Sequence, residues 1–215
     1  MEESLLPLFP LEVVLLPEEP LPLHIFEDRY KTMIGECLLA KAAGKGQEEF
    51  GVVLLKGKTV SSMGCTARIV NLTRLYEDGR MDILTVGKRR FEILQTNMEK
   101  SYLQGAVDYF DDEGPDAPTD AAAEQAIARF RDVMRKLRQA AEMPVHLPRP
   151  YRYLSFRIAG ALPFDLEFKQ QLLALRDEPE RLALVQRALE ILTNQLDHVQ
   201  EAQKKAGGNG HGRLR

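Results

Sequence analysis

The chain has 215 residues, of which 44% are hydrophobic and 28% charged, and its formal net charge is −3 at pH 7. These values are ordinary for a soluble globular protein with one large domain or two small ones, and no stretch approaches the roughly 18 consecutive apolar residues of a membrane-spanning helix. Glu2 and Glu3 stand where a secretory signal carries positive charge, and two cysteines are too few for a disulfide framework, so we expect a cytoplasmic protein.

Prolines divide the first forty residues into short apolar segments. Because each Pro lacks a backbone donor, these positions do not fit the middle of a paired sheet. The segments 11–16 and 21–26 are long enough only for edge or barrel strands. One early helix is predicted after Phe26, because apolar residues then recur at helical spacing. They are Tyr30, Met33, Ile34, Cys37 and Leu38.

The following segments predict further strands. Asp78-Gly79 lies between two β-type runs and is a strong hairpin signal, since both residues tolerate positive φ. Short strands at this spacing, together with one helix near the start, indicate a small closed or half-open barrel. The predicted strands are 50–56, 65–76, 81–86, 91–96 and 102–109.

The stretch 108–120 is rich in acidic residues, Gly and Pro, which predicts a solvated linker. Beyond it the apolar residues follow helical spacing. We expect a β domain over 1–112, a helical bundle over 119–205 and a disordered tail over 206–215. Four helices are predicted within the bundle. The first starts near Thr119 or Asp120 and ends before Pro144, and the second spans 153–161. The third spans 166–175 with Asp165 as N-cap, and the fourth follows Asp177.

Charge is unevenly distributed between these two parts. Residues 1–118 contain 13 Lys and Arg against 20 Asp and Glu, a net charge of −7, whereas residues 119–205 carry a net charge of +2. Nucleic-acid binding depends on clustered Lys and Arg that neutralise phosphates. The acidic β-rich part therefore argues against nucleic acid as a partner.

No catalytic, cofactor-binding or metal-binding constellation is predicted. The run 51–59 ends in Gly-Lys-Thr like a phosphate-binding loop, but five residues separate its glycines instead of four, and those residues are strand-like. The histidines have no ligand spacing, and His24, inside a proposed strand, is expected to be hydrogen-bonded and structural. No serine lies in a nucleophile frame. The paired acids Asp111 and Asp112 are expected to be solvated.

Several segments resemble the N-terminal substrate-binding domain of the ATP-dependent Lon proteases. They follow the order of the family and extend over roughly residues 5–196. The matching pieces are LPLFPLEVVLLP, LPLHIFEDRY, FGVVLL, GCTARI, the DGR of Asp78 to Arg80, GKRRFEIL and LPFDLEFKQQLLAL. The resemblance implies an α+β fold: a PUA-like β pseudobarrel with one early helix, then an α-helical bundle. A complete Lon continues into ATPase and Ser-Lys peptidase modules, for which 215 residues leave no room, so we expect a stand-alone, non-enzymatic binding module.

Residues near the proline-rich segments are the candidate substrate contacts. Arg29 and Tyr30 open the early helix and are candidates for engaging unfolded polypeptide; alternatively, Arg29 pairs with a local carboxylate and Tyr30 packs in the core. Leu15, Leu16 and Leu21 are candidates for receiving a client segment by strand addition, or they simply form core.

The expected partners follow from this hypothesis. They are unfolded or hydrophobic polypeptide and, as a second candidate, a complete Lon-type protease. We expect the chain to bind neither nucleic acid nor a membrane, and to be a monomer or weak dimer. Lys88-Arg89-Arg90 is the only basic cluster of the β-rich part and is either a solvated turn or an anchor for an acidic partner. Two alternative functions remain open: RNA binding, because PUA-like barrels also occur in RNA-modifying systems, and binding of a small molecule inside the barrel.

Overall fold

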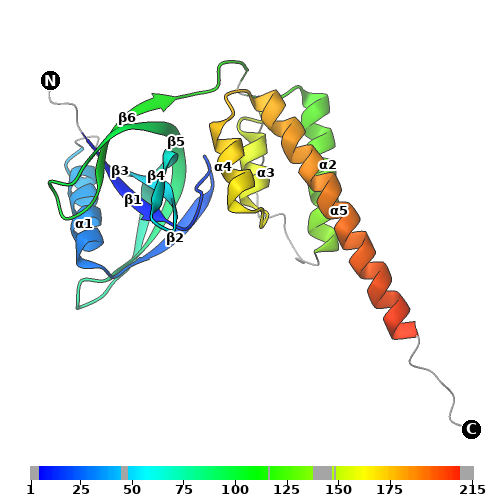
Figure 1. The fold of residues 1–215 in the computed structure, drawn as a ribbon, viewed down its shortest axis with the longest axis horizontal. Helices are drawn as coiled ribbons and strands as arrows, with labels where there is room; N and C mark the ends of the chain where they lie inside the picture. The colour runs from blue at the N-terminus through cyan, green and yellow to red at the C-terminus, as the bar shows by residue number, and fades with distance from the viewer. Residues whose placement is uncertain (1–4, 45–47, 116, 138–146, 148, 209–215) are drawn as a thin grey trace, which may run out of the picture.

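The computed structural model describes residues 5–44, 48–115, 117–137, 147 and 149–208. These residues form six strands and five helices; one helix lies between the second and third strands, and the other four follow the last strand (Figure 1). The strands are β1 (Leu6–Leu11), β2 (Pro20–Ile25), β3 (Glu49–Lys56), β4 (Thr59–Leu75), β5 (Met81–Asn97) and β6 (Gln104–Phe110). The helices are α1 (Asp28–Ala42), α2 (Asp120–Lys136), α3 (Leu154–Gly160), α4 (Leu166–Ala174) and α5 (Glu178–Gly208). The predicted α+β class, with one early helix and a helical second part, is confirmed.

The strands form one sheet that closes on itself. Its order is β2-β5-β4-β3-β1-β6, and an additional pairing of β5 with β6 closes a barrel of five strands. β2 lies outside this ring and pairs only with β5 in the described part of the chain. β1 and β3 run parallel, whereas the other neighbouring strands are antiparallel. β5 therefore carries three neighbours along its length and organises the whole sheet.

A small apolar cluster fills the barrel. It consists of Leu6, Leu8, Val53 and Phe91, all buried. A Cβ atom added at Gly64 would lie 2.5 Å from the Val52 carbonyl oxygen and 2.6 Å from Cζ of Phe91. Because real Cβ atoms do not approach other atoms so closely, the narrow barrel accommodates the Phe91 ring only opposite a glycine.

The first strand differs from the prediction. We expected strands over 11–16, but β1 ends at Leu11, and residues 12–19 connect it to β2. β1 contains Pro7 and Pro10, which the proline rule places outside doubly paired strands. The exception has a simple cause: residues 6 and 7 pair with β6, residues 8–11 pair with β3, and so each part of β1 is paired on one side.

The predicted strands 81–86 and 91–96 are one continuous strand, β5. Gly87, which separates them in the sequence, does not break the strand. A Cβ atom there would lie 2.1 Å from the Leu16 carbonyl oxygen. The backbone of Gly87 also donates to the Glu19 carbonyl and accepts from the Glu18 amide. Gly87 is therefore required for close approach of the β1–β2 connection, not for a turn.

Two helices of the second part begin at the side-chain caps that the sequence indicates. The Thr119 side chain accepts a hydrogen bond from the Ala122 amide, and Asp165 accepts one from the Phe168 amide at 2.7 Å. These predicted helix starts are confirmed. α5 continues to Gly208, three residues into the predicted tail, and residues 209–215 lie outside the described residues, as do residues 138–146.

α2 and α5 run parallel, side by side (Figure 1). Gln186 donates to the Ala122 carbonyl near the start of both helices, and Lys136 pairs with Asp197 at 2.7 Å near the end of α2. One continuous apolar cluster joins these helices to the outer face of the barrel and to α1. In the described residues, no helix combines the length and apolar character that crossing a membrane requires.

Candidate functional site

A buried ion network joins the barrel to the helices. The Asp112 carboxylate, just after β6, accepts from Arg90 of β5 at 2.6 Å and from Arg181 of α5 at 2.6 and 2.9 Å. Arg181 also pairs with Glu178 at 2.6 Å and donates to the Ser155 hydroxyl at 2.9 Å. All of these side chains are buried. We call these five residues the joint.

The joint also satisfies the end of α4. Arg90 donates to the Leu173 carbonyl at 3.2 Å and to the Leu175 carbonyl, and Arg181 donates to the same Leu175 carbonyl at 2.7 Å. The last carbonyl groups of a helix otherwise lack partners. The guanidinium of Arg181 lies 4.0 Å from the centre of the Phe156 ring, a cation–π distance. The joint thereby connects β5, α3, α4 and α5.

The β1–β2 connection makes a second, ionic contact with the helices. Glu18 pairs with Lys88 of β5 at 3.1 Å and with Arg157 of α3 at 3.0 Å. Glu19 pairs with Lys169 of α4 at 2.7 Å, and its other carboxylate oxygen accepts from the Leu16 amide. Half-buried ion pairs of this kind fix orientation more than they add stability.

Three sequence-based expectations are corrected by these contacts. Lys88-Arg89-Arg90 is neither a solvated turn nor a site for an external acidic partner, because Lys88 and Arg90 bind Glu18 and Asp112 of the same chain. Asp112 is 2% exposed, so it is not a solvated charge. The predicted linker is therefore not solvated throughout: residues 108–110 belong to β6, and the side chains of Phe110 and Asp112 are buried.

Three of the predicted substrate contacts lie in the core. Leu15, Leu16 and Tyr30 are buried, and the Tyr30 ring packs against Phe9 with ring centres 4.0 Å apart. Burial raises the pKa of the Tyr30 hydroxyl, although the neighbouring Arg29 acts in the opposite direction. In this conformation these three side chains therefore pack in the core and are not exposed to solvent.

The other two predicted contacts reach the surface. Leu21 of β2 is half-buried, and Arg29 is exposed. Arg29 pairs with the Glu27 carboxylate at 2.7 Å and lies 4.5 Å from the centre of the Tyr30 ring. The local ion pair matches the structural alternative for Arg29. The role of all five residues in binding stays a prediction.

A ring cluster that includes the end of β2 was not predicted. His24 of β2 stacks on Phe26 at 6.0 Å between ring centres and meets the Tyr76 ring edge-on at 5.9 Å. Asp82 holds the arrangement, since its carboxylate contacts His24 Nδ1 at 2.6 Å and accepts from the Tyr76 hydroxyl at 2.8 Å. His24 is thus hydrogen-bonded, as expected. Phe26 is 60% exposed.

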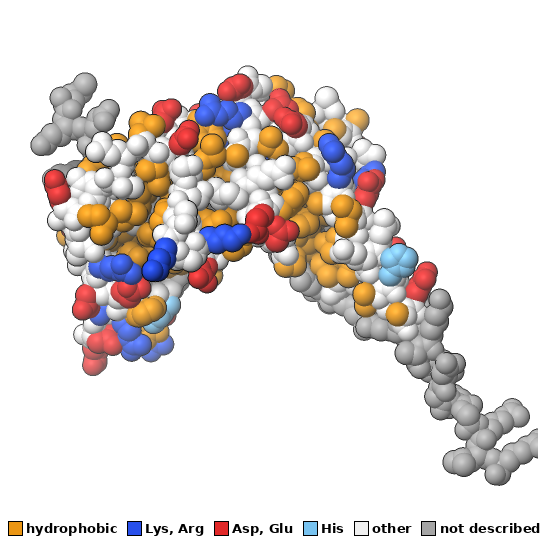
Figure 2. Space-filling model, viewed as in Figure 1, with side chains coloured by type: hydrophobic (Ala, Val, Ile, Leu, Met, Phe, Trp, Pro, Cys, Tyr) orange, Lys and Arg blue, Asp and Glu red, His pale blue; other side chains and the backbone are white. Residues whose placement is uncertain are grey.

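Cations surround this ring cluster. Arg74 and Arg80 lie 4.5 and 4.9 Å from the centre of the Tyr76 ring. In Figure 2, basic, acidic and hydrophobic side chains lie together at the lower end of the β-rich part. An exposed aromatic ring with cations beside it suits contact with apolar and polar parts of a polypeptide at once. The signal in the sequence is the alternation of Pro22, His24 and Phe26 on an edge strand.

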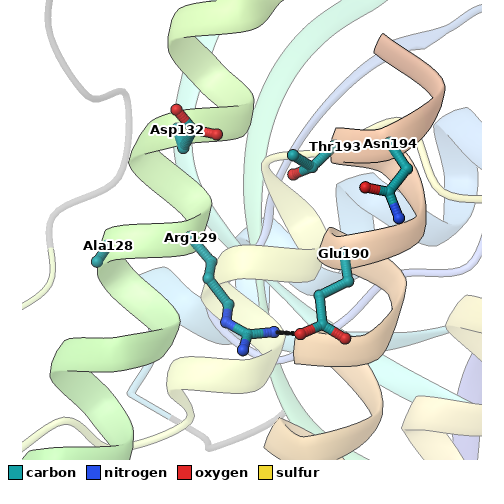
Figure 3. Close-up of a pocket in the computed structure, with 6 residues that line it drawn as sticks. All are labelled: Ala128, Arg129, Asp132, Glu190, Thr193 and Asn194. Atoms are coloured by element: carbon teal, nitrogen blue, oxygen red, sulfur yellow. Dashed lines mark hydrogen bonds and ion pairs between the residues drawn. The ribbon is translucent and has the colours of Figure 1, made fainter. Parts of the chain in front are cut away.

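A shallow groove of about 490 Å³ lies between α2 and α5 (Figure 3). Arg129 reaches across it to Glu190, and Asp132 pairs with Arg135 and Lys136 of its own helix. Its charged groups are therefore already satisfied within the protein. The groove is a seam between two helices whose charged side chains are already paired within the protein.

The remaining candidate motifs of the sequence have the following environments in the described residues. Among them, no group of three His, Cys, Asp or Glu is placed to hold a metal ion. The run 51–59 forms a β hairpin in which Gly57 has φ of 64°, so its backbone does not wrap around a phosphate. The side chains of His24 and Asp82 hydrogen-bond to each other, and the Asp82 carboxylate also accepts from the Tyr76 hydroxyl, whereas the Thr73 hydroxyl donates to the backbone carbonyl of Asp82.

These features define a class of protein: a closed β barrel with one helix on it, firmly joined to a helical part, as in the substrate-binding domains of ATP-dependent proteases. Residues 5–191 match the family described as the ATP-dependent protease La (LON) substrate-binding domain. The chain therefore belongs to this family, and the resemblance inferred from the sequence is confirmed.

Relatives and solved structures agree with this assignment. The chain is 28% identical over 188 residues to a Lon protease of Parabacteroides distasonis and 24% identical over 193 residues to one of Cytophaga hutchinsonii. These matches cover 82% and 83% of this chain but only 22% and 23% of the relatives, so the chain spans less than a quarter of their length.

Two solved structures have a similar fold. A Lon N-terminal domain protein from Xanthomonas campestris is 26% identical, with a TM-score of 0.63 over 84% of this chain and 95% of that one. The N-terminal domain of a Lon protease of the Mycobacterium avium complex has a TM-score of 0.59 over 89% of this chain and 98% of that one. At 16% identity, the second likeness concerns the fold alone.

Proposed function

We propose that this chain is a non-enzymatic recognition module that binds exposed hydrophobic segments of unfolded polypeptides, without ATPase or peptidase activity of its own. The observation that carries this proposal is the match of residues 5–191 to a substrate-binding domain family. The same match supports the non-enzymatic part, because the family is described as a substrate-binding domain.

The ring cluster is the proposed contact surface; Leu21, on the other face of β2 from His24, and Arg29, exposed on α1, remain further candidate contacts. Phe26 offers an exposed aromatic face, and Asp82 fixes the His24 ring next to it. A rigid aromatic surface loses little conformational entropy when a client binds. Leu15, Leu16 and Tyr30 then contribute as the packed support beneath this surface rather than as direct contacts.

The biological setting is part of the same proposal. The relatives are Lon proteases by name, so we propose that the module delivers clients to a complete protease of this kind or competes with it. We propose a PUA-like barrel that acts in the cytoplasm as a monomer or weak dimer. Two free, buried cysteines are consistent with a reducing compartment.

Fluorescence anisotropy with a labelled, permanently unfolded model protein tests the proposal. Phe26→Ser should weaken binding about tenfold, because it removes an exposed aromatic anchor. Ile191→Ser is the matched control, since Ile191 of α5 is also 60% exposed but lies far along the chain from the ring cluster.

Three results would contradict the proposal. They are failure of the unfolded protein to bind, equal binding of the folded and unfolded forms of the same model protein, and ATP hydrolysis or peptide cleavage by pure material.

A further inference from the structure

Several strand edges lack a neighbouring strand in the described residues. One is β2, which pairs only with β5. A second is the end of β4, residues 69–75, which pairs with β5 alone; two register shifts, between Ile69 and Asn71 and between Leu72 and Arg74, interrupt the regular spacing of this edge. A third is the C-terminal part of β6: β1 pairs with Gln104 and Gly105, whereas residues 106–110 pair with β5 alone. An unpaired edge presents N–H and C=O groups to which an extended polypeptide can add as a further strand.

The β2 edge is closed to strand addition by its prolines. Leu21, Leu23 and Ile25 alternate with Pro20, Pro22 and His24 along β2. In an antiparallel pair, alternate residues direct their backbone groups to opposite sides, and proline is tolerated where its nitrogen faces the open side. The open side then has a donor only at His24, which is too few for a ladder.

The β6 edge carries no such block. Its sequence from 104 to 110 is QGAVDYF, without proline. Asp108 is exposed and Tyr109 is 39% exposed, so the side chains beside the edge are reachable. In Figure 1, β6 ends at the upper margin of the barrel, away from α1 and before the chain turns to α2. A partner strand would meet backbone groups and side chains together there.

Charge at this edge indicates what kind of strand would bind. Asp108 lies directly opposite Glu92 of β5, and neither has a Lys or Arg at salt-bridge distance among the described residues. Like charges opposite each other in an antiparallel pair are destabilising. A cation between the two carboxylates would remove this repulsion. Leu94 lies two residues after Glu92 in β5, where a bulge leaves it without a partner in β6. Its side chain is 68% exposed.

We propose that the open edge of β6, residues 106–110, binds an extended polypeptide by strand addition, and that it prefers segments with Lys or Arg beside apolar residues. The net charge of −7 over residues 1–118 acts in the same direction, because it attracts cationic segments from a distance. This inference rests on the proposed function and names the client class. It moves strand addition from the first strands, where we predicted it, to β6.

Three labelled peptides with the same apolar residues test the inference against the whole purified chain. The first has flanking lysines, the second flanking glutamates, and the third has flanking lysines and alternate N-methylated amides that remove backbone donors. At low salt the lysine peptide should bind at least about tenfold more tightly than the other two. Equal affinity of the N-methylated and unmodified lysine peptides would overturn strand addition.

A matched pair of variants locates the charge effect. Glu92→Gln with Asp108→Asn should reduce the lysine-to-glutamate preference to near one, and both changes relieve repulsion, so this variant should fold. Glu12→Gln with Glu99→Gln changes the net charge equally, at exposed positions outside the β5–β6 pairing, and should leave the preference largely intact.

The outcomes separate the two proposals. An equal loss of preference in both variants would show a long-range charge effect and would overturn the β6 site. If all three peptides bind equally well, the proposed function stands and this inference fails. If none of them binds, both fail.

Discussion

Replacement of Asp112 by alanine is the most direct test of how the two parts are held together. The Asp112 side chain is 2% exposed, and the partner side chains Arg90 and Arg181 are 3% and 0% exposed. Asp112→Ala therefore leaves Arg90 buried without a carboxylate, while Arg181 keeps Glu178. Breaking a buried pair by removal of one partner costs about 3–5 kcal/mol. A protein with about 5–15 kcal/mol of stability would lose a large part of it.

Urea denaturation followed by circular dichroism measures this loss. With a slope of about 2.5 kcal/mol per molar urea, the midpoint should fall by about 1.5 M. Asp111→Ala is the matched control, because Asp111 is exposed and takes part in no ion pair among the described residues; its free energy of unfolding should change by less than about 0.5 kcal/mol. A midpoint for Asp112→Ala that is indistinguishable from that of the control would refute the importance of the joint.

Three further predictions concern pH, packing and thiol chemistry. Burial raises the pKa of Asp112, but the two guanidinium groups beside it lower the pKa more, so the folded-state pKa lies below the unfolded one. Its contribution to stability is therefore present above the unfolded pKa of about 3.9 and lost as pH falls towards the folded value; Asp112→Asn should shrink the difference in unfolding free energy between pH 7 and acid. Gly64→Ala should cost about 1–3 kcal/mol in urea unfolding because its Cβ meets Phe91, and adding Phe91→Leu should restore part of that loss, whereas a further loss would speak against the clash. Burial raises the pKa of the Cys37 thiol to about 11 and that of Cys65 further, so a thiol reagent should label neither in the folded protein and both in denaturant; rapid labelling of the folded form would contradict their burial.

Features set by local sequence could be predicted. The starts of α2 and α4 follow from Thr119 and Asp165, whose side chains cap the next turn regardless of tertiary context. The hairpin at Asp78-Gly79 likewise depends on residues inside the turn, where Gly79 has φ of 80°. The overall α+β architecture could be predicted because several segments occur in the same order as in the Lon substrate-binding family, whereas no single segment predicts it.

Features set by distant partners could not be predicted. β1 begins earlier than expected because its pairing depends on β3 and β6, and the role of Gly87 depends on the Leu16 carbonyl. The joint unites residues that are separated by 22 and 69 positions. One signal was available in the sequence. Glu178 and Arg181 precede the apolar residues Leu182 and Val185 by four positions each, and this helical spacing places both charges on the buried face of α5.

The length of α5 gives the joint a mechanical meaning. The helix has 31 residues and so measures about 46 Å, and its first turn contains both Glu178 and Arg181. A tilt of about 10° at that turn would displace the far end by about 8 Å, given this length. Because α2 is bound to α5 farther along the helix, loss of the ion cluster would tilt the two helices together relative to the barrel.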